Sequence, residues 1–112
     1  MWFMFPIIQG LGKSDTAQYY AIESIDEANA FIDHPYLGNH YKNCLEAVLG
    51  HQDKTTRIIF NGKIDDWKFR SSLTLFKNLP SDNTEKENIQ RCLKYFYNNE
   101  PCSKTLETLQ RL

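Results

Sequence analysis

Residues 65–79 read Asp-Asp-Trp-Lys-Phe-Arg-Ser-Ser-Leu-Thr-Leu-Phe-Lys-Asn-Leu, and the predicted fold is built around them. The apolar residues of this stretch cover most of the circumference of a helix; they are Trp67, Phe69, Leu73, Leu75, Phe76 and Leu79. A helix that is apolar nearly all round is buried among other elements. The two aspartates suit the positive N-terminal end of such a helix. The stretch therefore predicts a central, buried helix from about residue 65 to residue 78.

Local start and stop signals predict further helices before this stretch. Residues 24–27 (Ser-Ile-Asp-Glu) form a capping box, which starts a helix that runs to about His34. Pro35 suits the first turn of the next helix, because its missing N–H has no helical partner there. Within that second helix, Gly38 indicates a close approach by another backbone, and Gly50 is expected to end the helix in the left-handed conformation.

Residues 55–60 fit a short strand as well as a short helix. We favour a short helix, ended by Asn61 and Gly62, because the chain offers no convincing partner strand.

The C-terminal third is predicted to be helical as well. A second capping box at residues 82–85 (Asp-Asn-Thr-Glu) precedes a helix that closes at residues 98–101, and Ser103 starts the last helix. The sequence therefore predicts an all-α fold, in which residues 1–112 form one domain, a compact orthogonal bundle of about six short helices. The expected core comprises Phe31, Leu45, Trp67, Phe69, Leu73, Phe76 and Leu93.

The composition excludes several classes of protein. The chain has 112 residues, of which 41% are hydrophobic and 24% are charged, which is enough for one packed domain. Thirteen basic residues stand against fourteen acidic ones, which disfavours binding to nucleic acid through phosphate neutralisation. No apolar run reaches the roughly 18 residues of a transmembrane helix, and the start of the chain lacks the features of a signal peptide. We therefore expect neither a nucleic-acid partner nor a membrane association.

The cysteines indicate a reduced, cytoplasmic protein. Cys44, Cys92 and Cys102 are odd in number and lack CxxC spacing, so no disulfide, metal or cofactor is expected. His40 lies one helical turn from Cys44, an arrangement that a nucleophilic pair or part of a metal site would require. Because Cys44 belongs to an apolar stripe, we favour an ordinary buried thiol.

The loop at residues 10–14 (Gly-Leu-Gly-Lys-Ser) matches neither phosphate-binding motif that it resembles. A P-loop would need a glycine where Ile7 stands, and a dinucleotide-binding motif would need one where Asp15 stands. The favoured structure is a glycine turn that leads into a helix capped by Ser14. Free N–H groups at such a helix start can still hold an anion. The loop residues assigned to anion binding are Gly12, Lys13 and Ser14.

Polar residues interrupt the central helix. Lys68 and Ser72 are one turn apart and would face a polar cleft if they bind a ligand. The favoured alternative is structural, because hydroxyl groups within a helix bond to carbonyls or let a neighbouring helix pack closely. Arg70 lies on a different side and is expected in an ion pair. The complete set of candidate ligand-binding residues is Gly12, Lys13, Ser14, His34, Lys68 and Ser72.

Two kinds of function are compatible with these residues. We favour a binding or regulatory module for a small anionic ligand, such as a metabolite, or for a protein partner. The alternative is an enzyme of unknown reaction. Its expected cleft comprises Ser14, His34, Lys68 and Ser72. The candidates for its general base are His34, Asp65 and Asp66. His34 is also expected to act as a cap or hinge residue between two helices.

Five blocks of the sequence, taken in order, resemble one known family. They are residues 2–6 (Trp-Phe-Met-Phe-Pro), 10–14, 20–22 (Tyr-Ala-Ile), 30–38 (Ala-Phe-Ile-Asp-His-Pro-Tyr-Leu-Gly) and 65–76. Their order and spacing resemble the domain of unknown function family 1810 (DUF1810) from residue 1 to about residue 110. The resemblance implies a small, mainly helical bacterial domain whose activity is not established.

The same resemblance implies a further N-terminal helix, which is missing from this sequence. We therefore expect a bundle that is incomplete at its N-terminus. The apolar residues expected to lie uncovered there are Trp2, Phe3, Phe5, Ile7 and Ile8. Since burial of one large side chain stabilises a protein by about 1.5–3 kcal/mol, we expect these residues to form an exposed patch or to be covered by self-association.

Overall fold

Of the stretch at residues 65–79, residues 65–77 lie in the central helix, α5 (Lys63–Lys77). The computed structural model describes residues 5–11, 21–79 and 85–111. Its other helices are α2 (Ile25–Asp33), α3 (Pro35–Leu49), α4 (Thr56–Ile59), α6 (Lys86–Tyr97) and α7 (Ser103–Gln110). Within the described residues, β-type pairing is limited to one isolated bridge between Ile8 and Ile22. The predicted all-α fold is therefore confirmed, and the described part of the chain contains six helices.

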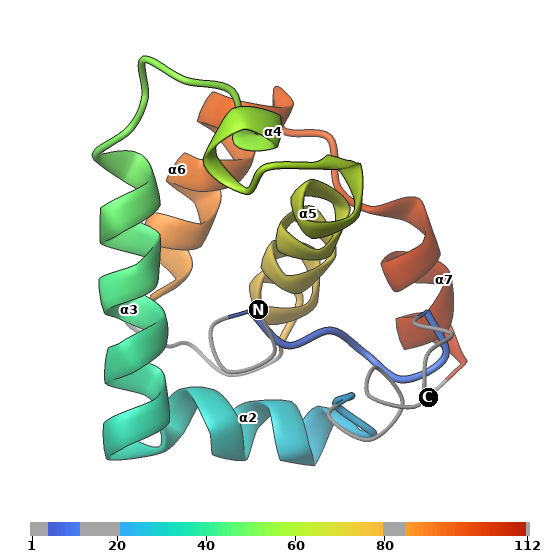
Figure 1. The fold of residues 1–112 in the computed structure, drawn as a ribbon. Helices are drawn as coiled ribbons and strands as arrows, with labels where there is room; N and C mark the ends of the chain where they lie inside the picture. The colour runs from blue at the N-terminus through green and yellow to red at the C-terminus, as the bar shows by residue number, and fades with distance from the viewer. Residues whose placement is uncertain (1–4, 12–20, 80–84, 112) are drawn as a thin grey trace.

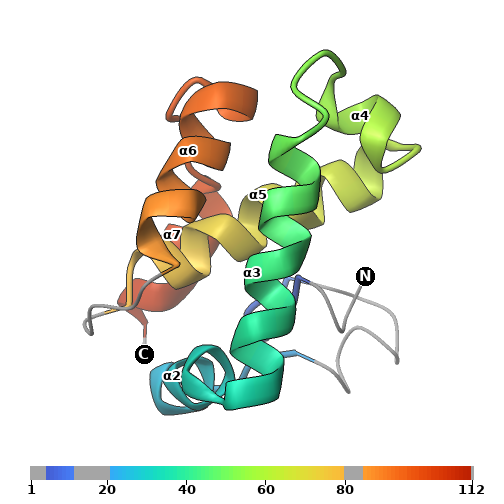
Figure 2. The ribbon, with the colours of Figure 1, turned by 90° about the vertical axis from the view of Figure 1, so that its left-hand side faces the viewer.

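The helices cross one another at steep angles. In Figure 1, α3 stands upright, α2 lies across its lower end, and α5 points toward the viewer in the middle. In the turned view of Figure 2, α5 passes behind α3. α5 packs against α2, α4, α6 and α7, while α3 packs against α2 and α6. α5 therefore contacts more of the other helices than α3 does.

α5 is the most buried helix, as predicted. Phe69 and all six residues from Ser71 to Phe76 are buried. Leu45 of α3 and Leu93 of α6 belong to the same core. Burial on every side explains why the apolar residues of α5 do not follow a single stripe.

Two residues expected in the core lie at its edge. Trp67 is only half-buried, because it lines an open pocket near the start of α5. Phe31 is also half-buried, on the outer helix α2, where its ring packs against Tyr41 and Phe76 at centroid distances of 6.2 and 5.6 Å.

Capping interactions confirm most of the predicted helix boundaries. The Ser24 hydroxyl accepts a hydrogen bond from the backbone N–H of Glu27 (3.0 Å), and the Glu27 carboxylate accepts one from the N–H of Glu23 (3.0 Å). Residues 55–60 contain the short helix α4, which ends at Ile59, and Asn61 and Gly62 follow it with positive φ. α6 ends at Asn98 in the left-handed conformation.

Two boundary predictions differ from the structure. Gly50 is right-handed (φ −69°), not left-handed, because α3 continues into a further turn in which the His51 N–H donates to the Val48 carbonyl (3.0 Å). α6 begins at Lys86, after Glu85, whose side chain makes no capping hydrogen bond. The rest of the capping box predicted at residues 82–85 lies outside the described residues.

The close backbone approach predicted at Gly38 is present at the junction of α2 and α3. A Cβ atom at this position would overlap the carbonyl oxygen of Ile32. Only glycine therefore permits α3 to leave α2 at this angle.

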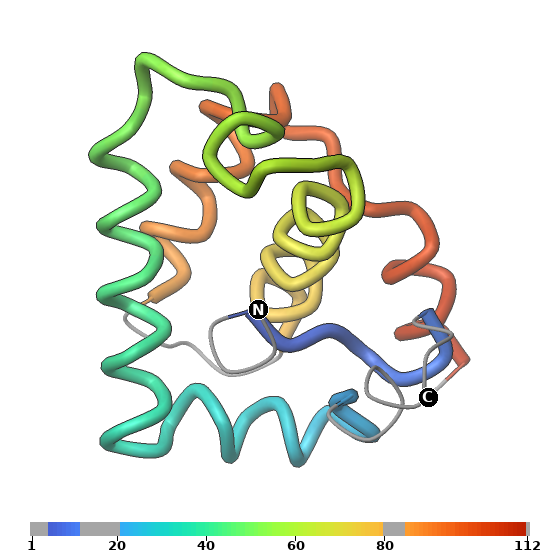
Figure 3. Tube along the Cα trace, in the orientation of Figure 1, coloured from blue at the N-terminus to red at the C-terminus, as the bar shows by residue number. Residues whose placement is uncertain are grey.

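The N-terminal segment differs most from the prediction. Phe5, Ile7 and Ile8 are each only 1% exposed. In Figure 3 their segment runs between α2 and α5, and Ile22 holds it through two backbone hydrogen bonds of 2.8 Å, to Ile7 and Gln9. The prediction that these three residues lie uncovered is wrong, because helices of the same chain cover them. Trp2 and Phe3 lie outside the described residues, and self-association stays a prediction.

No helix in the described part of the chain combines the length and the apolar character needed to cross a membrane.

Candidate functional site

Half of the ligand-binding residues predicted from the sequence lie outside the described residues. They are Gly12, Lys13 and Ser14. Their proposed anion loop therefore stays a prediction. The other three, His34, Lys68 and Ser72, occupy different surroundings.

His34 is a cap, as predicted. Its Nδ1 accepts hydrogen bonds from the backbone N–H groups of Tyr36 (3.1 Å) and Leu37 (3.2 Å) at the start of α3. The backbone N–H of His34 donates to the carbonyls of Ala30 and Phe31 at the end of α2. These hydrogen bonds satisfy backbone N–H groups at the start of α3 and backbone carbonyls at the end of α2. The position of His34 is therefore explained without a ligand.

Ser72 lies inside the core. It is fully buried, and its hydroxyl is 3.3 Å from the hydroxyl of Tyr41, which is also fully buried. Burial raises the pKa of Tyr41, so this phenol stays protonated as a neutral partner. Lys68, one turn away, is half-buried and has an interaction partner of its own. This burial favours the structural interpretation of Ser72 over a polar cleft shared with Lys68.

The other hydroxyl groups of α5 are paired as well. Ser71 and Thr105 place their hydroxyl oxygens 2.6 Å apart, which joins α5 to α7. Thr74 donates to the Arg70 carbonyl (2.8 Å) and accepts from the backbone N–H of Cys102 (2.9 Å). These bonds confirm that polar residues within a buried helix connect it to its neighbours.

The His40 and Cys44 side chains do meet on α3. The Cys44 sulfur lies 3.8 Å from Nε2 of His40. Burial raises the pKa of the Cys44 thiol, whereas an activated nucleophile needs a lowered one. Within the described ranges, no three residues among His, Cys, Asp and Glu are arranged to bind a metal ion.

Of the two aspartates predicted as general-base candidates, Asp66 has the side-chain partners. Its carboxylate accepts a hydrogen bond from the Tyr97 hydroxyl (2.6 Å) and lies 3.7 Å from the Arg57 guanidinium. Asp65 is half-buried in the same first turn of α5. The enzyme hypothesis stays a prediction, since the described residues of its expected cleft have separate structural contacts.

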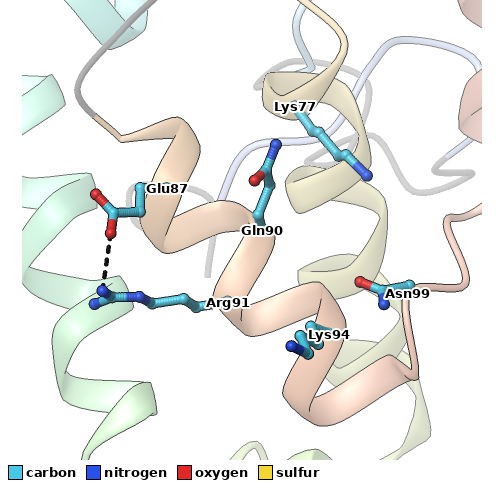
Figure 4. Close-up of a pocket in the computed structure, with 6 residues that line it drawn as sticks. All are labelled: Lys77, Glu87, Gln90, Arg91, Lys94 and Asn99. Atoms are coloured by element: carbon cyan, nitrogen blue, oxygen red, sulfur yellow. Dashed lines mark hydrogen bonds and ion pairs between the residues drawn. The ribbon is translucent and has the colours of Figure 1, made fainter.

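A pocket that the sequence did not predict lies between α5 and α6. It has a volume of about 360 Å³ and combines side chains from both helices and from the loop after α6. Figure 4 shows these side chains, which are Lys77, Glu87, Gln90, Arg91, Lys94 and Asn99. We call it the α5–α6 pocket.

Positive charge dominates the α5–α6 pocket. Among the described residues that line it, three are cations and one, Glu87, is a carboxylate, which pairs with Arg91 at 2.8 Å. Both side chains of this pair are largely exposed, and a pair of this kind contributes little stability. Among the described residues, neither Lys77 nor Lys94 has an ion-pair or hydrogen-bond partner.

The remaining side chains of the pocket can also donate hydrogen bonds. Gln90 is exposed on α6, and Asn99 is held in the loop after α6 by a hydrogen bond from its backbone N–H to the Leu93 carbonyl (3.0 Å). Each of these two carboxamides has two N–H donors, and neither has a hydrogen-bond partner among the described residues. The α5–α6 pocket therefore offers an anion three cations and two amide groups.

Sequence reasoning missed this pocket because each of its residues is ordinary on its own. The nearest signal in the sequence is the pattern of α6, where Gln90, Arg91 and Lys94 fall on the polar face of an amphipathic helix. Only the packing of α6 against α5 adds Lys77 to this group.

Comparisons with known proteins identify a family but no activity. The chain is similar to the conserved hypothetical protein Rv1873 from Mycobacterium tuberculosis, whose crystal structure superimposes with a TM-score of 0.89. The two sequences are 33% identical over 97% of this chain and 75% of the other. No curated protein matches the sequence. Residues 1–109 match the family described as "Protein of unknown function (DUF1810)". Both the family match and the shared fold confirm the resemblance of the sequence blocks, and the chain therefore belongs to the DUF1810 family.

Proposed function

We propose that this protein is a binding module for a small anionic ligand, and that the ligand binds in the α5–α6 pocket. One observation carries this proposal: three cations border the pocket, and two of them, Lys77 and Lys94, have no partner in the described part of the chain. Cations held close together repel one another, and an anion between them relieves that repulsion.

The shape and donors of the pocket define the kind of ligand. A volume of about 360 Å³ is at the lower end for small-molecule sites. Lysine ammonium groups and carboxamides donate in several directions, so a phosphate or a polycarboxylate with several oxygens fits them. Arg91 and Lys94 also border a second open pocket of about 370 Å³ beside Gln52 and Tyr95, so an extended ligand can reach these cations from both sides.

The cellular setting is part of the same proposal. Three free cysteines, two of them buried, suit a reducing compartment, and we place the protein in the cytoplasm. Small phosphorylated or carboxylated molecules are the ligands that this setting would supply.

Titration calorimetry with inorganic phosphate and with citrate tests the proposal. We expect citrate to bind more tightly than phosphate, and both to bind more weakly as salt is added, because salt screens exposed charges. Lys94→Gln should weaken citrate binding about tenfold, and Lys77→Gln combined with Lys94→Gln about a hundredfold, since each charge-assisted hydrogen bond contributes about 1.5–3 kcal/mol.

Lys104→Gln is the matched control. Lys104 is an exposed lysine of α7 outside the pocket, and its loss removes the same charge from the protein. Equal weakening by Lys104→Gln and Lys94→Gln would show that net charge, not the pocket, attracts the anion. The proposal would then be wrong.

A further inference from the structure

Another pocket lies where α4, the start of α5 and the end of α6 meet. It has a volume of about 300 Å³, and none of the described residues that line it also lines the α5–α6 pocket. Its lining comprises Arg57, Lys63, Asp66, Trp67, Arg70 and Tyr97. We call it the Trp67 pocket.

The indole ring of Trp67 is available in this pocket. Neighbouring aromatic rings pack on one another: Phe69 lies 4.9 Å from Phe60 and 6.2 Å from Tyr97 between ring centroids. In the described part of the chain, Trp67 takes part in no such ring contact, and it is half-buried. A large ring that lines a pocket without a ring partner can stack against a planar ligand.

Arg70 is held in place at the same pocket. Its Nε donates to the Glu100 carbonyl (2.8 Å), and its guanidinium lies 5.2 Å from the centroid of the Tyr97 ring. Three of the five guanidinium N–H groups remain for another acceptor once the bonds to the Glu100 carbonyl and carboxylate are counted. A cation that is already positioned loses little entropy when it binds an anion.

Among the described residues of the pocket, Asp66 is the one carboxylate, and it is already occupied. Asp66 accepts the short bond from the Tyr97 hydroxyl, and burial raises the pKa of Tyr97, which keeps this donor protonated. Arg57 adds a looser ion pair to Asp66 at 3.7 Å, and its side chain is 65% exposed. Arg57 can therefore turn from Asp66 to an incoming anion at little cost.

We propose that the Trp67 pocket is a second ligand site, selective for a small aromatic anion. The aromatic ring stacks against Trp67, and the carboxylate or phosphate of the ligand binds Arg57, Lys63 and Arg70. This site is independent of the α5–α6 pocket, because it uses other residues and requires a ring as well as a charge.

The indole N–H resonance of Trp67 reports on this site directly. It is assigned in the NMR spectrum of the full chain by its absence from the Trp67→Phe variant. Phenyl phosphate should shift the resonance with saturation and bind about tenfold more tightly than inorganic phosphate or phenol, because neither fragment makes both contacts. Arg57→Gln should weaken phenyl phosphate about tenfold.

Lys94→Gln is the control that separates the two sites. It should leave the response of Trp67 to phenyl phosphate unchanged while it weakens citrate binding at the α5–α6 pocket. Three results would each overturn this inference: no saturable shift with millimolar phenyl phosphate, equal affinity for phenyl phosphate and inorganic phosphate, or an unchanged affinity in Arg57→Gln. None of these results bears on the α5–α6 pocket, so the two proposals can fail separately.

Discussion

The polar groups inside α5 differ from those in the α5–α6 pocket in whether they have partners. Ser71, Ser72 and Thr74 are fully buried, and each hydroxyl is bonded to another part of the chain. Lys77, at the end of the same helix, has no partner among the described residues. Buried polar groups must be satisfied internally, whereas a polar group at an open pocket keeps its donors for a ligand. The comparison separates residues that hold the fold together from residues that are free to bind.

The largest expected effect is on the free energy of unfolding, and it should differ sharply between two adjacent residues of α5. Phe76 is fully buried against Phe31 and Tyr41, so Phe76→Ala should lower the free energy of unfolding by about 3–5 kcal/mol. Lys77→Ala, one position later, should change it by less than about 0.5 kcal/mol. Urea denaturation measures both. A loss below about 1 kcal/mol for Phe76→Ala would show that α5 is peripheral.

A smaller effect is expected from the buried hydroxyl pair. Ser72→Ala leaves the Tyr41 hydroxyl without its partner in the core, which should cost about 1–3 kcal/mol. Tyr41→Phe should cost a similar amount, but the double variant should lose less than the sum, because both partners are then removed. Additive losses in this double-mutant cycle would mean that the two hydroxyls do not interact.

Alkaline pH should destabilise the core, because burial raises the pKa of two of its ionisable side chains. Burial raises the pKa of Cys92 to about 12 and also raises that of Tyr41. In the unfolded chain a cysteine ionises near pH 8.5. Stability should therefore be complete below about pH 8.5 and fall as pH rises toward 12, since the unfolded state alone loses the proton in that window.

The alkaline effect is measured by thermal unfolding between neutral pH and pH 10. Cys92→Ala should have a lower melting temperature throughout but a shallower decline with pH. An equal decline in both proteins would assign the alkaline loss to other groups.

The smallest effect is expected from the unpartnered cations. Lys77→Gln combined with Lys94→Gln should leave the melting temperature without ligand unchanged or slightly raised, because it removes like charges and breaks no internal bond. A clear fall in melting temperature would mean that these lysines stabilise the fold, and it would remove the contrast with the interior of α5.

Much of the fold could be predicted because its signals are local. The periodicity of α5, the Ser24 capping box, the His34 cap and the stop at Asn61 and Gly62 depend on residues within a few positions of one another. The prediction of an ion pair for Arg70 is also confirmed, with Glu100 at 3.4 Å.

The N-terminal segment could not be predicted in the same way. A short apolar run without helical or alternating periodicity does not reveal what covers it. Phe5 packs edge-on against Tyr41, Phe60 and Phe69, with ring centroids 5.5, 5.9 and 4.6 Å away. These partners come from α3, from the turn after α4 and from α5, so only the assembled core shows that Phe5 is buried.

The sequence by itself determined the helices, most of their boundaries and the family, because hydrophobic spacing and capping act over a few residues. Tertiary structure alone decided which polar side chains lie together. Lys77 and Lys94 share a pocket because α6 packs against α5, and Trp67 lines another because α4 and α6 meet at the start of α5. Such sites depend on contacts between distant parts of the chain, and a surface lysine has the same local sequence signal whether or not a pocket forms beside it.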